Sequence, residues 1–210
     1  MRLSEHTSYM KNFLSFTVAF FICLGAFSQK DVFKVIQLLP GVQSGSEGQS
    51  GFYVRGGGAD QNLIILDDAT VYNAQHLFGF FSLFNGDAIR SVELIKGGFP
   101  ARYGGRLSSV LDMNMKEGNK DHYTGEVGIG LISSRGLFEG PLPGSKGKGS
   151  FLISGRRTYI DALIQPAVVA QSGALSGYFF YDLNAKANYE FDDKNKIFLS
   201  SYFGRDKIYY

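Results

Sequence analysis

One segment near the end of the sequence constrains the fold more than any other. From Tyr181 to Phe191, apolar and polar residues alternate without interruption. One face of an extended chain would carry Leu183, Ala185, Ala187, Tyr189 and Phe191, and the other Asp182, Asn184, Lys186, Asn188 and Glu190. Successive side chains of a β-strand point to opposite faces, so a period of two is the repeat of a strand. The segment therefore predicts a strand with one apolar face and one polar face.

Further segments of strand length follow His122. They are residues 123–131, 135–140, 150–159 and 196–206. Segments of about 9 to 11 residues with one apolar face, one polar face and aromatic residues near their ends are typical of transmembrane β-barrels. A half-buried antiparallel sheet of a soluble protein has the same period. The alternation alone leaves both structures open.

Loop lengths favour the barrel. The stretches 141–149 (PLPGSKGKG) and 192–195 (DDKN) are short and rich in turn residues, whereas a longer stretch containing Gly, Ser and Ala spans 161–180. Outer-membrane barrels have short periplasmic turns and longer external loops, and the three stretches fit that asymmetry in order. Such barrels begin at about eight strands, and an open sheet edge cannot remain unsatisfied in lipid. We therefore expect antiparallel strands of an incomplete transmembrane β-barrel.

The N-terminal region has the pattern of an export signal. Residues 13–27 (FLSFTVAFFICLGAF) form an uncharged apolar run preceded by Lys11, and Ala26 and Ser28 place small residues just before Gln29. A cation, an apolar core too short for a comfortable membrane span, and small residues at the cleavage site are typical of a signal peptide. The sequence predicts a signal peptide over residues 1–28, with Met10 as an alternative start of translation. A buried helix or an uncleaved anchor is the alternative structure.

Residues 31–115 differ in character from the alternating region. Asp31 can cap a short helix over residues 31–39, which Pro40 and Gly41 would end. Strand candidates follow at residues 52–55, 62–67, 89–96 and 110–115. Glycine clusters separate them, and the 27 Gly, 19 Phe and 12 Tyr of the chain suit a β-rich protein with many turns. This region is predicted to be a small α+β unit.

Four motifs in this region resemble, in order, the plug domain of TonB-dependent outer-membrane receptors. They are LPGV at 39–42, VRGGG at 54–58 with NLIILDD at 62–68, VELIKGG at 92–98 and ARYGG at 101–105. The stretches HLFGFFSLFN at 76–85 and FPARYGGRLSSVL at 99–111 are similar to the form of the plug found in Bacteroidota receptors. We therefore expect an α+β plug domain over residues 29–118, followed over 119–210 by the antiparallel N-terminal strands of an incomplete transmembrane β-barrel.

The resemblance implies a receptor of the cell outer membrane that imports its ligand. In this family the barrel spans the membrane lipid and the plug blocks its lumen. A TonB-type energy transducer moves the plug so that a siderophore, cobalamin, metal chelate or glycan can pass. No cofactor and no catalytic residue is implied. The stretch between Gln29 and Asp31 holds no visible contact segment for the transducer, and only about five of roughly 22 strands are present, so we expect a fragment or a truncated gene product.

The resemblance also implies roles for charged residues of the plug. Arg55 and Arg102 occupy positions where the family has arginines that pair with barrel carboxylates, and a guanidinium group suits such pairs. Asp67 and Glu93 match positions that we interpret as internal polar anchors. The same motifs also contain Gly56, Gly97, Tyr103 and Gly104. The alternative is that the four charged residues are ordinary surface charges.

An aromatic cluster around a histidine is a second candidate site. It comprises His76, Phe78, Phe80 and Phe81, with Phe84 close behind. The cluster suits either the core of the plug or an apex of the plug that faces the ligand. His76 has no Cys or carboxylate neighbour at ligand spacing, so no metal site is predicted.

Charge and motif content argue against other function classes. The formal net charge is +2 and no basic block occurs, which disfavours a nucleic-acid partner. The run 55–58 (RGGG) lacks both the GxxxxGK[ST] pattern and the strand–loop–helix frame of a phosphate loop. Ser50 and Ser108 lack the context of a nucleophile elbow. The sequence therefore predicts no enzymatic activity.

A second function class stays open. The chain could be a stand-alone periplasmic module, a plug that binds a ligand or a partner protein by itself, or a truncated product without function. A free plug has no use for a lipid-facing alternation such as that from Leu183 to Phe191. The strand pattern therefore favours the receptor.

Overall fold

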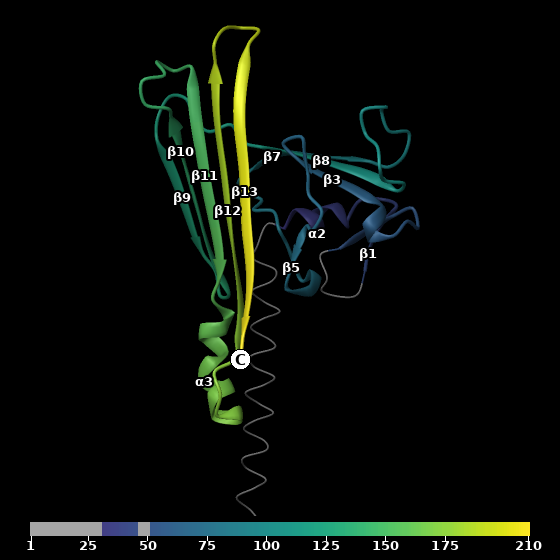
Figure 1. The fold of residues 1–210 in the computed structure, drawn as a ribbon, viewed down its shortest axis with the longest axis vertical. Helices are drawn as coiled ribbons and strands as arrows, with labels where there is room; N and C mark the ends of the chain where they lie inside the picture. The colour runs from purple at the N-terminus through teal and green to yellow at the C-terminus, as the bar shows by residue number, and fades with distance from the viewer. Residues whose placement is uncertain (1–30, 46–50) are drawn as a thin grey trace, which may run out of the picture.

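The computed structural model describes residues 31–45 and 51–210. The predicted signal peptide, residues 1–28, lies outside these ranges. Two regions lie side by side: a mixed α/β region from residue 31 to 115, here called the plug, and a tall antiparallel sheet from residue 124 to 209, here called the wall (Figure 1).

The plug is built around a four-stranded sheet of order β4-β3-β8-β7. β3 and β8 are parallel, and the other two pairs are antiparallel. Two small hairpins, β1–β2 and β5–β6, flank this sheet. The elements are α2 (Val32–Ile36), β1 (Val42–Ser44), β2 (Phe52–Val54), η1 (Ala59–Gln61), β3 (Asn62–Leu66), β4 (Ala69–Thr70), β5 (Gln75–His76), η2 (Leu77–Gly79), β6 (Phe81–Ser82), β7 (Ile89–Ile95) and β8 (Ser109–Met115). The predicted α+β unit is confirmed.

Helix α2 begins where the sequence predicts and ends earlier. The Asp31 carboxylate caps it by accepting a hydrogen bond from the Phe33 amide at 2.9 Å. The helix stops at Ile36, and the chain continues as tighter turns in which the Leu39 amide donates to the Ile36 carbonyl at 3.0 Å. The residue before a proline is disfavoured in the α conformation, so Pro40 shortens the helix from its C-terminal side.

The wall is a five-stranded sheet of order β13-β12-β11-β10-β9 in which every neighbouring pair is antiparallel. Its strands are β9 (Thr124–Ile129), β10 (Ser133–Pro141), β11 (Gly149–Thr158), β12 (Gly177–Glu190) and β13 (Lys196–Tyr209). Each corresponds to a strand predicted from the sequence, with ends shifted by a few residues. The sheet is open along both edges, as expected for a barrel that is not closed.

The connection between β11 and β12 contains a helix that the sequence analysis did not predict. Helix α3 (Ile160–Ser172) includes Pro166 and ends at Gly173, which has a φ of 68°. The stretch 161–180 was interpreted as an external loop because it contains Gly, Ser and Ala and alternates with the short turns. Pro166, which has no backbone N–H and disfavours a helix interior, gives no local signal for α3 either. None of the helices in the described ranges is long and apolar enough to cross a membrane.

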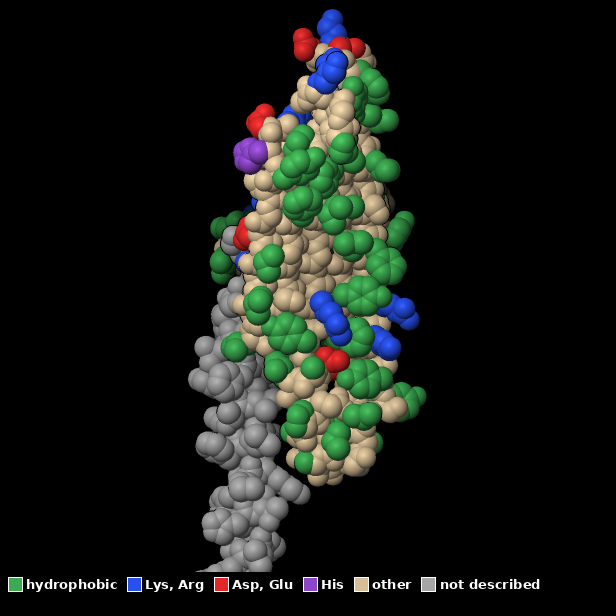
Figure 2. All heavy atoms as spheres, turned by 90° about the vertical axis from the view of Figure 1, so that its left-hand side faces the viewer, with side chains coloured by type: hydrophobic (Ala, Val, Ile, Leu, Met, Phe, Trp, Pro, Cys, Tyr) green, Lys and Arg blue, Asp and Glu red, His purple; other side chains and the backbone are tan. Residues whose placement is uncertain are grey.

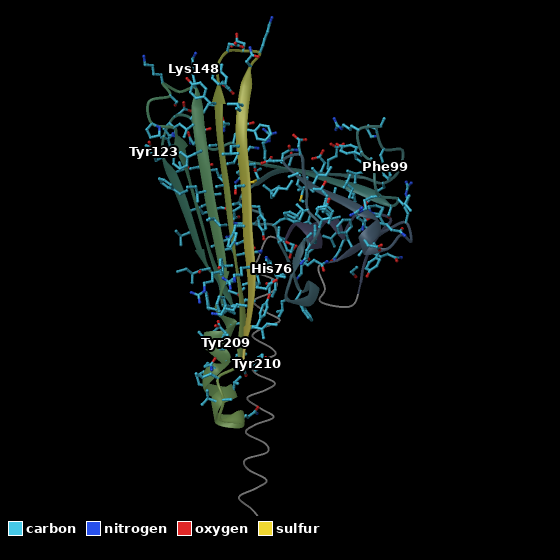
Figure 3. The ribbon with its side chains drawn as sticks, in the orientation of Figure 1. His76, Phe99, Tyr123, Lys148, Tyr209 and Tyr210 are labelled. Carbon is cyan, nitrogen blue, oxygen red and sulfur yellow. The ribbon has the colours of Figure 1, made fainter. Side chains whose placement is uncertain are left out.

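The two ends of the wall differ in their connections. Helix α3 lies at one end, here called the α3 end, and the turns 142–148 and 191–195 lie at the other, here called the turn end (Figure 1). Tyr209 marks the α3 end, and Tyr123 and Lys148 mark the turn end (Figure 3). The turns 142–148 and 191–195 therefore share one end of the sheet, as the sequence predicts, while the short connection 130–132 between β9 and β10 lies with α3 at the other end.

The apolar core belongs mainly to the plug. Phe33 contacts Phe52 and Phe84 edge-on, with ring centroids 5.2 and 5.4 Å apart. Leu137 of β10 and Leu152 of β11 join this core from the wall. The plug therefore packs its apolar interior partly on the inner face of the wall.

Candidate functional site between plug and wall

The wall has its polar side chains inside and its apolar side chains outside. On β12 the residues Asp182, Asn184, Lys186 and Asn188 are 2–6% exposed, and they face the plug. Leu183, between two of them, is 47% exposed on the opposite face. A half-buried sheet of a soluble protein would have the reverse polarity, because its apolar face packs on the core. The alternation therefore brings charged groups into the contact between wall and plug.

One polar cluster in this contact centres on His76, which ends β5 and is 3% exposed. Its Nε2 lies 2.6 Å from an Asp182 oxygen, and its Nδ1 lies 2.8 Å from an Asp206 oxygen (Figure 3). The imidazole ring stacks on Phe180 with a centroid distance of 4.2 Å. Ionised carboxylates only accept hydrogen bonds, so each ring nitrogen bonds its carboxylate by donating.

The partners of His76 are held by further side chains of the wall. Arg156 donates from Nε to Asp182 at 2.8 Å, donates to the same carboxylate from Nη2, and reaches the Ser82 carbonyl of the plug at 2.7 Å. The Tyr202 hydroxyl donates to Asp182 at 2.8 Å. Arg156 and Asp182 thus form a buried ion pair, with side chains 2% and 0% exposed, and the further hydrogen bonds to Asp182 offset the desolvation penalty of the buried charges.

Tyr178 ties the same cluster to the chain that follows His76. Its hydroxyl donates to Asp206 and accepts from the Leu77 amide at 2.9 Å. Leu77 has a φ of 49°, an uncommon conformation for a residue with a side chain. We refer to His76, Arg156, Tyr178, Asp182, Tyr202 and Asp206 as the His76 cluster.

A second polar cluster centres on Asp67, directly after β3. Its Oδ1 accepts from the Met115 amide at 3.0 Å and from Lys186 Nζ at 2.8 Å, and its Oδ2 accepts from the Ser200 hydroxyl at 2.7 Å. The side chains of Asp67 and Lys186 are 1% and 6% exposed. Asp67 itself has a φ of 46°, so its contacts fix an uncommon backbone conformation. This group, the Asp67 cluster, joins the plug to β12 and β13.

The linker between plug and wall provides a third set of contacts. The Glu117 carboxylate lies 2.6 Å from Lys196 of β13 and 3.3 Å from Arg90 of β7. The hydrogen bond from Lys196, with the charges of Lys196 and Arg90, holds the pKa of Glu117 below its usual value. The Glu117 carbonyl accepts from Asn188 at 2.5 Å and from Ser150 at 2.8 Å. The linker is therefore fastened to three strands of the wall and to β7 of the plug.

Two of the residues proposed from sequence as plug sites take part in these clusters. Asp67 and His76 are buried and contact the wall. Phe81 is 9% exposed, and its ring centroid lies 5.4 Å from that of Phe180. Phe78 lies in η2, and Phe80 is 45% exposed. That His76, Phe78, Phe80 and Phe81 face a ligand stays a prediction.

The other proposed residues lie away from the wall. Arg55, Glu93 and Gly104 are exposed. Gly56 and Gly97 have φ values of 79° and 109°, conformations that suit glycine and explain why these turns use it.

Arg102 and Tyr103 form a separate chain of contacts on the plug. Arg102 donates to the Tyr103 hydroxyl at 2.6 Å, and this hydroxyl donates to Asp112 at 2.6 Å. The bond to Asp112 raises the pKa of Tyr103, and the bond to Tyr103 raises the pKa of Arg102. Among the described residues, neither Arg55 nor Arg102 contacts a wall carboxylate, so their proposed pairing with the barrel stays a prediction.

The wall side of the contact was not predicted from the sequence. The residues not singled out there are Arg156, Asp182, Lys186, Ser200, Tyr202 and Asp206. A signal for Asp182 and Lys186 was present, because both belong to the polar face of the alternating segment. The described residues contain no group of three or more side chains placed to hold a metal ion.

Comparisons with known proteins agree with this architecture. Residues 24–109 match the family model of the TonB-dependent Receptor Plug Domain. No curated protein matches the sequence. The fold is similar to the siderophore receptor PirA from Pseudomonas aeruginosa, with 19% identity and a TM-score of 0.56 over 84% of this chain and 32% of that one.

Two structures of the ferric enterobactin receptor PfeA from Pseudomonas aeruginosa, both of variants, are similar as well. One has 22% identity and a TM-score of 0.56 over 86% of this chain and 31% of that one. The other has 19% identity and a TM-score of 0.56 over 85% and 30%. The chain spans about a third of the length of these receptors. Residues 24–109 therefore match a TonB-dependent receptor plug domain, and the fold of the described chain, a plug packed on antiparallel wall strands, is similar to that of these receptors.

Proposed function

We propose that this chain is the plug and adjoining wall of an outer-membrane receptor that imports a small ligand. The wall lies in the membrane with its apolar face toward lipid, and the plug closes the lumen on the other face. The observation that carries the proposal is the polarity of the wall, which exposes Leu183 and buries Asp182 and Lys186 against the plug. A periplasmic module would gain nothing from an exposed apolar face backed by buried charges.

The imported ligand is a siderophore, cobalamin, metal chelate or glycan. Support for a siderophore comes from the solved structures of similar fold, which are named as siderophore and ferric enterobactin receptors. Inner-membrane energy reaches the plug through a TonB-type transducer. No catalytic residue takes part, since transport needs only that the plug moves relative to the wall.

The polar contacts suit a plug that must separate from its wall. Hydrogen-bonded groups can exchange protein partners for water at a small net cost, whereas an apolar interface would lose its full burial on opening. The His76 cluster lies toward the α3 end, where the longer connection is expected to face outside. Ligand arriving at this end would meet the His76 cluster before the Asp67 cluster. We therefore assign the first step of opening to the His76 cluster.

Cell fractionation tests the proposal directly. We expect an antibody raised to the plug to detect a heat-modifiable band in the outer membrane. A soluble periplasmic band near 20 kDa, close to the 23.1 kDa of the chain less its signal peptide, would instead support the stand-alone module.

A pair of substitutions sharpens this test. Leu183→Lys places a charge on the outer face, where it costs about 2–4 kcal/mol if that face meets lipid. We expect this variant to be lost from the outer membrane, while the matched Leu183→Ile stays there. Equal recovery of both variants in the membrane would contradict a lipid-facing wall.

A further inference from the structure

The charged residues at the outward positions of the wall strands lie toward one end of the sheet. Outward positions alternate with the buried positions of each strand, and the sheet register shows which of them are neighbours. The charged residues among the outward strand positions are Arg157, Arg205 and Lys207. All three are exposed, and all three are cations. Figure 2 shows the same face, with hydrophobic side chains spread over it, Lys and Arg side chains beside an Asp or Glu side chain in its lower part, and further charged side chains at its upper end.

The three cations form a compact group across neighbouring strands. Tyr181 pairs with Arg157 on one side and with Arg205 on the other, so these residues form one row across β11, β12 and β13. Phe179 pairs with Lys207 in the next row toward the α3 end. The Arg157 guanidinium carbon lies 4.9 Å from the Phe179 ring centroid, and Lys207 Nζ lies 5.9 Å from it.

These cations have aromatic neighbours and no anionic partner. Within the described part of the chain, none of them forms an ion pair. Asp161, at the start of α3, accepts a hydrogen bond from the Tyr209 hydroxyl at 3.1 Å, and Asp206, between Arg205 and Lys207 in the sequence, contacts His76 on the inner face. Within the described residues, the three cations thus stand beside aromatic rings without an ion pair.

The group stands at the edge of the apolar band. Tyr189, near the turn end, and Tyr181 are both outward residues of β12. The outward residues between these two tyrosines are Ala187, Ala185 and Leu183. At about 3.3 Å per residue, these eight steps cover roughly 26 Å along the strand, which is a height of about 20 Å for a strand tilted by about 40°. The apolar band of an outer-membrane barrel is about 25 Å tall and is bounded by aromatic residues. Arg157 and Arg205 therefore share the row of the bounding aromatic residue Tyr181, and Lys207 lies one row farther toward the α3 end.

We propose that Arg157, Arg205 and Lys207 form a binding surface for the phosphate of a membrane lipid headgroup. This inference rests on the proposed function, since only a wall in the membrane meets lipid. A guanidinium group binds phosphate through two parallel hydrogen bonds, and the two arginines flank Tyr181 so that both can reach one headgroup. Phe179 and Tyr181 supply apolar contact at the boundary between headgroup and acyl chain.

Flotation with vesicles tests the inference on the complete chain. Three compositions are compared: phosphatidylcholine alone, phosphatidylcholine with 10 mol% diphosphorylated lipid A, and phosphatidylcholine with a carboxylate lipid at equal negative charge. We expect lipid A to strengthen vesicle binding by about tenfold or more, since each cation near an anionic surface favours binding severalfold. The carboxylate lipid is expected to give a smaller gain.

A charge-matched pair of variants locates the effect. The triple variant Arg157→Gln, Arg205→Gln, Lys207→Gln should lose the gain from lipid A and keep its binding to phosphatidylcholine. The control Arg106→Gln, Lys146→Gln, Lys194→Gln removes equal charge elsewhere and should keep the gain. The double variant Arg157→Lys, Arg205→Lys keeps the positive charge but lacks the guanidinium groups that bind phosphate through two hydrogen bonds. Its vesicle binding should rise with lipid A only as much as it rises with the carboxylate lipid.

The outcomes separate this inference from the function on which it rests. Equal gains for the triple variant and the unchanged chain, or equal gains from lipid A and the carboxylate lipid, would overturn the phosphate surface and leave a lipid-facing wall intact. Absence of binding to every vesicle by a chain with native circular dichroism would overturn both. Far-UV circular dichroism of each variant shows that the comparison is made between folded chains.

Discussion

The interior of the plug and the inner face of the wall are both buried, yet they use opposite kinds of side chain. The plug encloses Phe33, Phe84 and Met113, each at most 2% exposed. The wall buries Asp182 and Lys186 at 3% and 6%. An apolar core is held by the release of water and by close packing, whereas the polar contact depends on mutual satisfaction of its charges. The first suits a domain that stays folded, and the second suits a contact that must open.

The largest expected effect tests the apolar half of this comparison. Phe84→Ala removes a ring that packs on Phe33 in the plug core, and a buried phenylalanine truncated to alanine costs about 3–5 kcal/mol in the free energy of unfolding. Urea unfolding of the chain in detergent, followed by circular dichroism, measures the loss. Leu199→Ala is the control, because Leu199 is 74% exposed on the outer face and its truncation should cost about 0.5 kcal/mol or less. Similar losses for both would show that the two faces do not differ as described.

A comparable effect is expected from removing the centre of the His76 cluster. Asp182→Ala leaves His76 and Arg156 buried without their shared carboxylate, which should weaken plug attachment by about 3–5 kcal/mol. Protease protection of the plug measures this attachment. Replacing all three residues with apolar ones of similar size should recover most of the loss, because a buried ion cluster and a packed apolar cluster are often close in stability. A triple variant as weak as Asp182→Ala would contradict that account.

The Asp67 cluster is expected to show a smaller but measurable coupling. A double-mutant cycle with Asp67→Asn and Lys186→Met should give an interaction free energy of about 1–3 kcal/mol, since the two side chains are in direct contact. Asp68→Asn is the matched control, because Asp68 is the next residue and is exposed. Additive effects of the two substitutions would mean that the contact does not hold the plug.

The linker predicts a modest pH dependence. The pKa of Glu117 is lowered in the folded chain by Lys196 and Arg90, so its contribution to stability is present above the unfolded value of about 4.3 and is lost as the pH falls through the folded value. The side chain is 29% exposed, which limits the contribution to about 1 kcal/mol or less. Unfolding curves between pH 6 and pH 3 should differ in slope between the native chain and Glu117→Gln. Identical slopes would remove Glu117 from the linker contact.

The smallest effect is expected for the exposed arginines of the plug. Arg55→Ala and Arg102→Ala should leave the urea midpoint of the purified chain unchanged, because neither residue contacts the wall in the described structure. Their proposed pairing with barrel carboxylates predicts reduced transport and reduced retention of the plug in cells. Unchanged transport and unchanged retention of the plug in the double variant would contradict the anchoring role.

Much of the fold could be predicted because its signals are local. The strict period of two from Tyr181 to Phe191 specified a strand and its two faces, and glycines and turn residues located the ends of most strands. Helix α3 and the first residues of β12 lie in the stretch 161–180, which its Gly, Ser and Ala content and the order of the connections indicated as an external loop. Pro166 is a further local signal against a helix, and the surrounding structure overrides it.

The candidate site was predicted only in half. Asp67 and His76 could be selected by motif and by their unusual neighbours, but their partners could not. His76 lies 106 residues from Asp182 and 130 residues from Asp206 in the sequence. No local pattern links residues so far apart, because their contact depends on how the plug docks and on the register of β12 and β13.

The sequence by itself determined that the chain has a glycine-rich plug followed by strands with one polar and one apolar face. Only the tertiary structure decided that the polar face is the buried one. A period of two gives the same strand in both cases, and the choice between its faces depends on what packs against each side. Here the plug supplies His76 and Asp67 as partners for the wall charges, so burying the polar face satisfies those charges and leaves the apolar face outside.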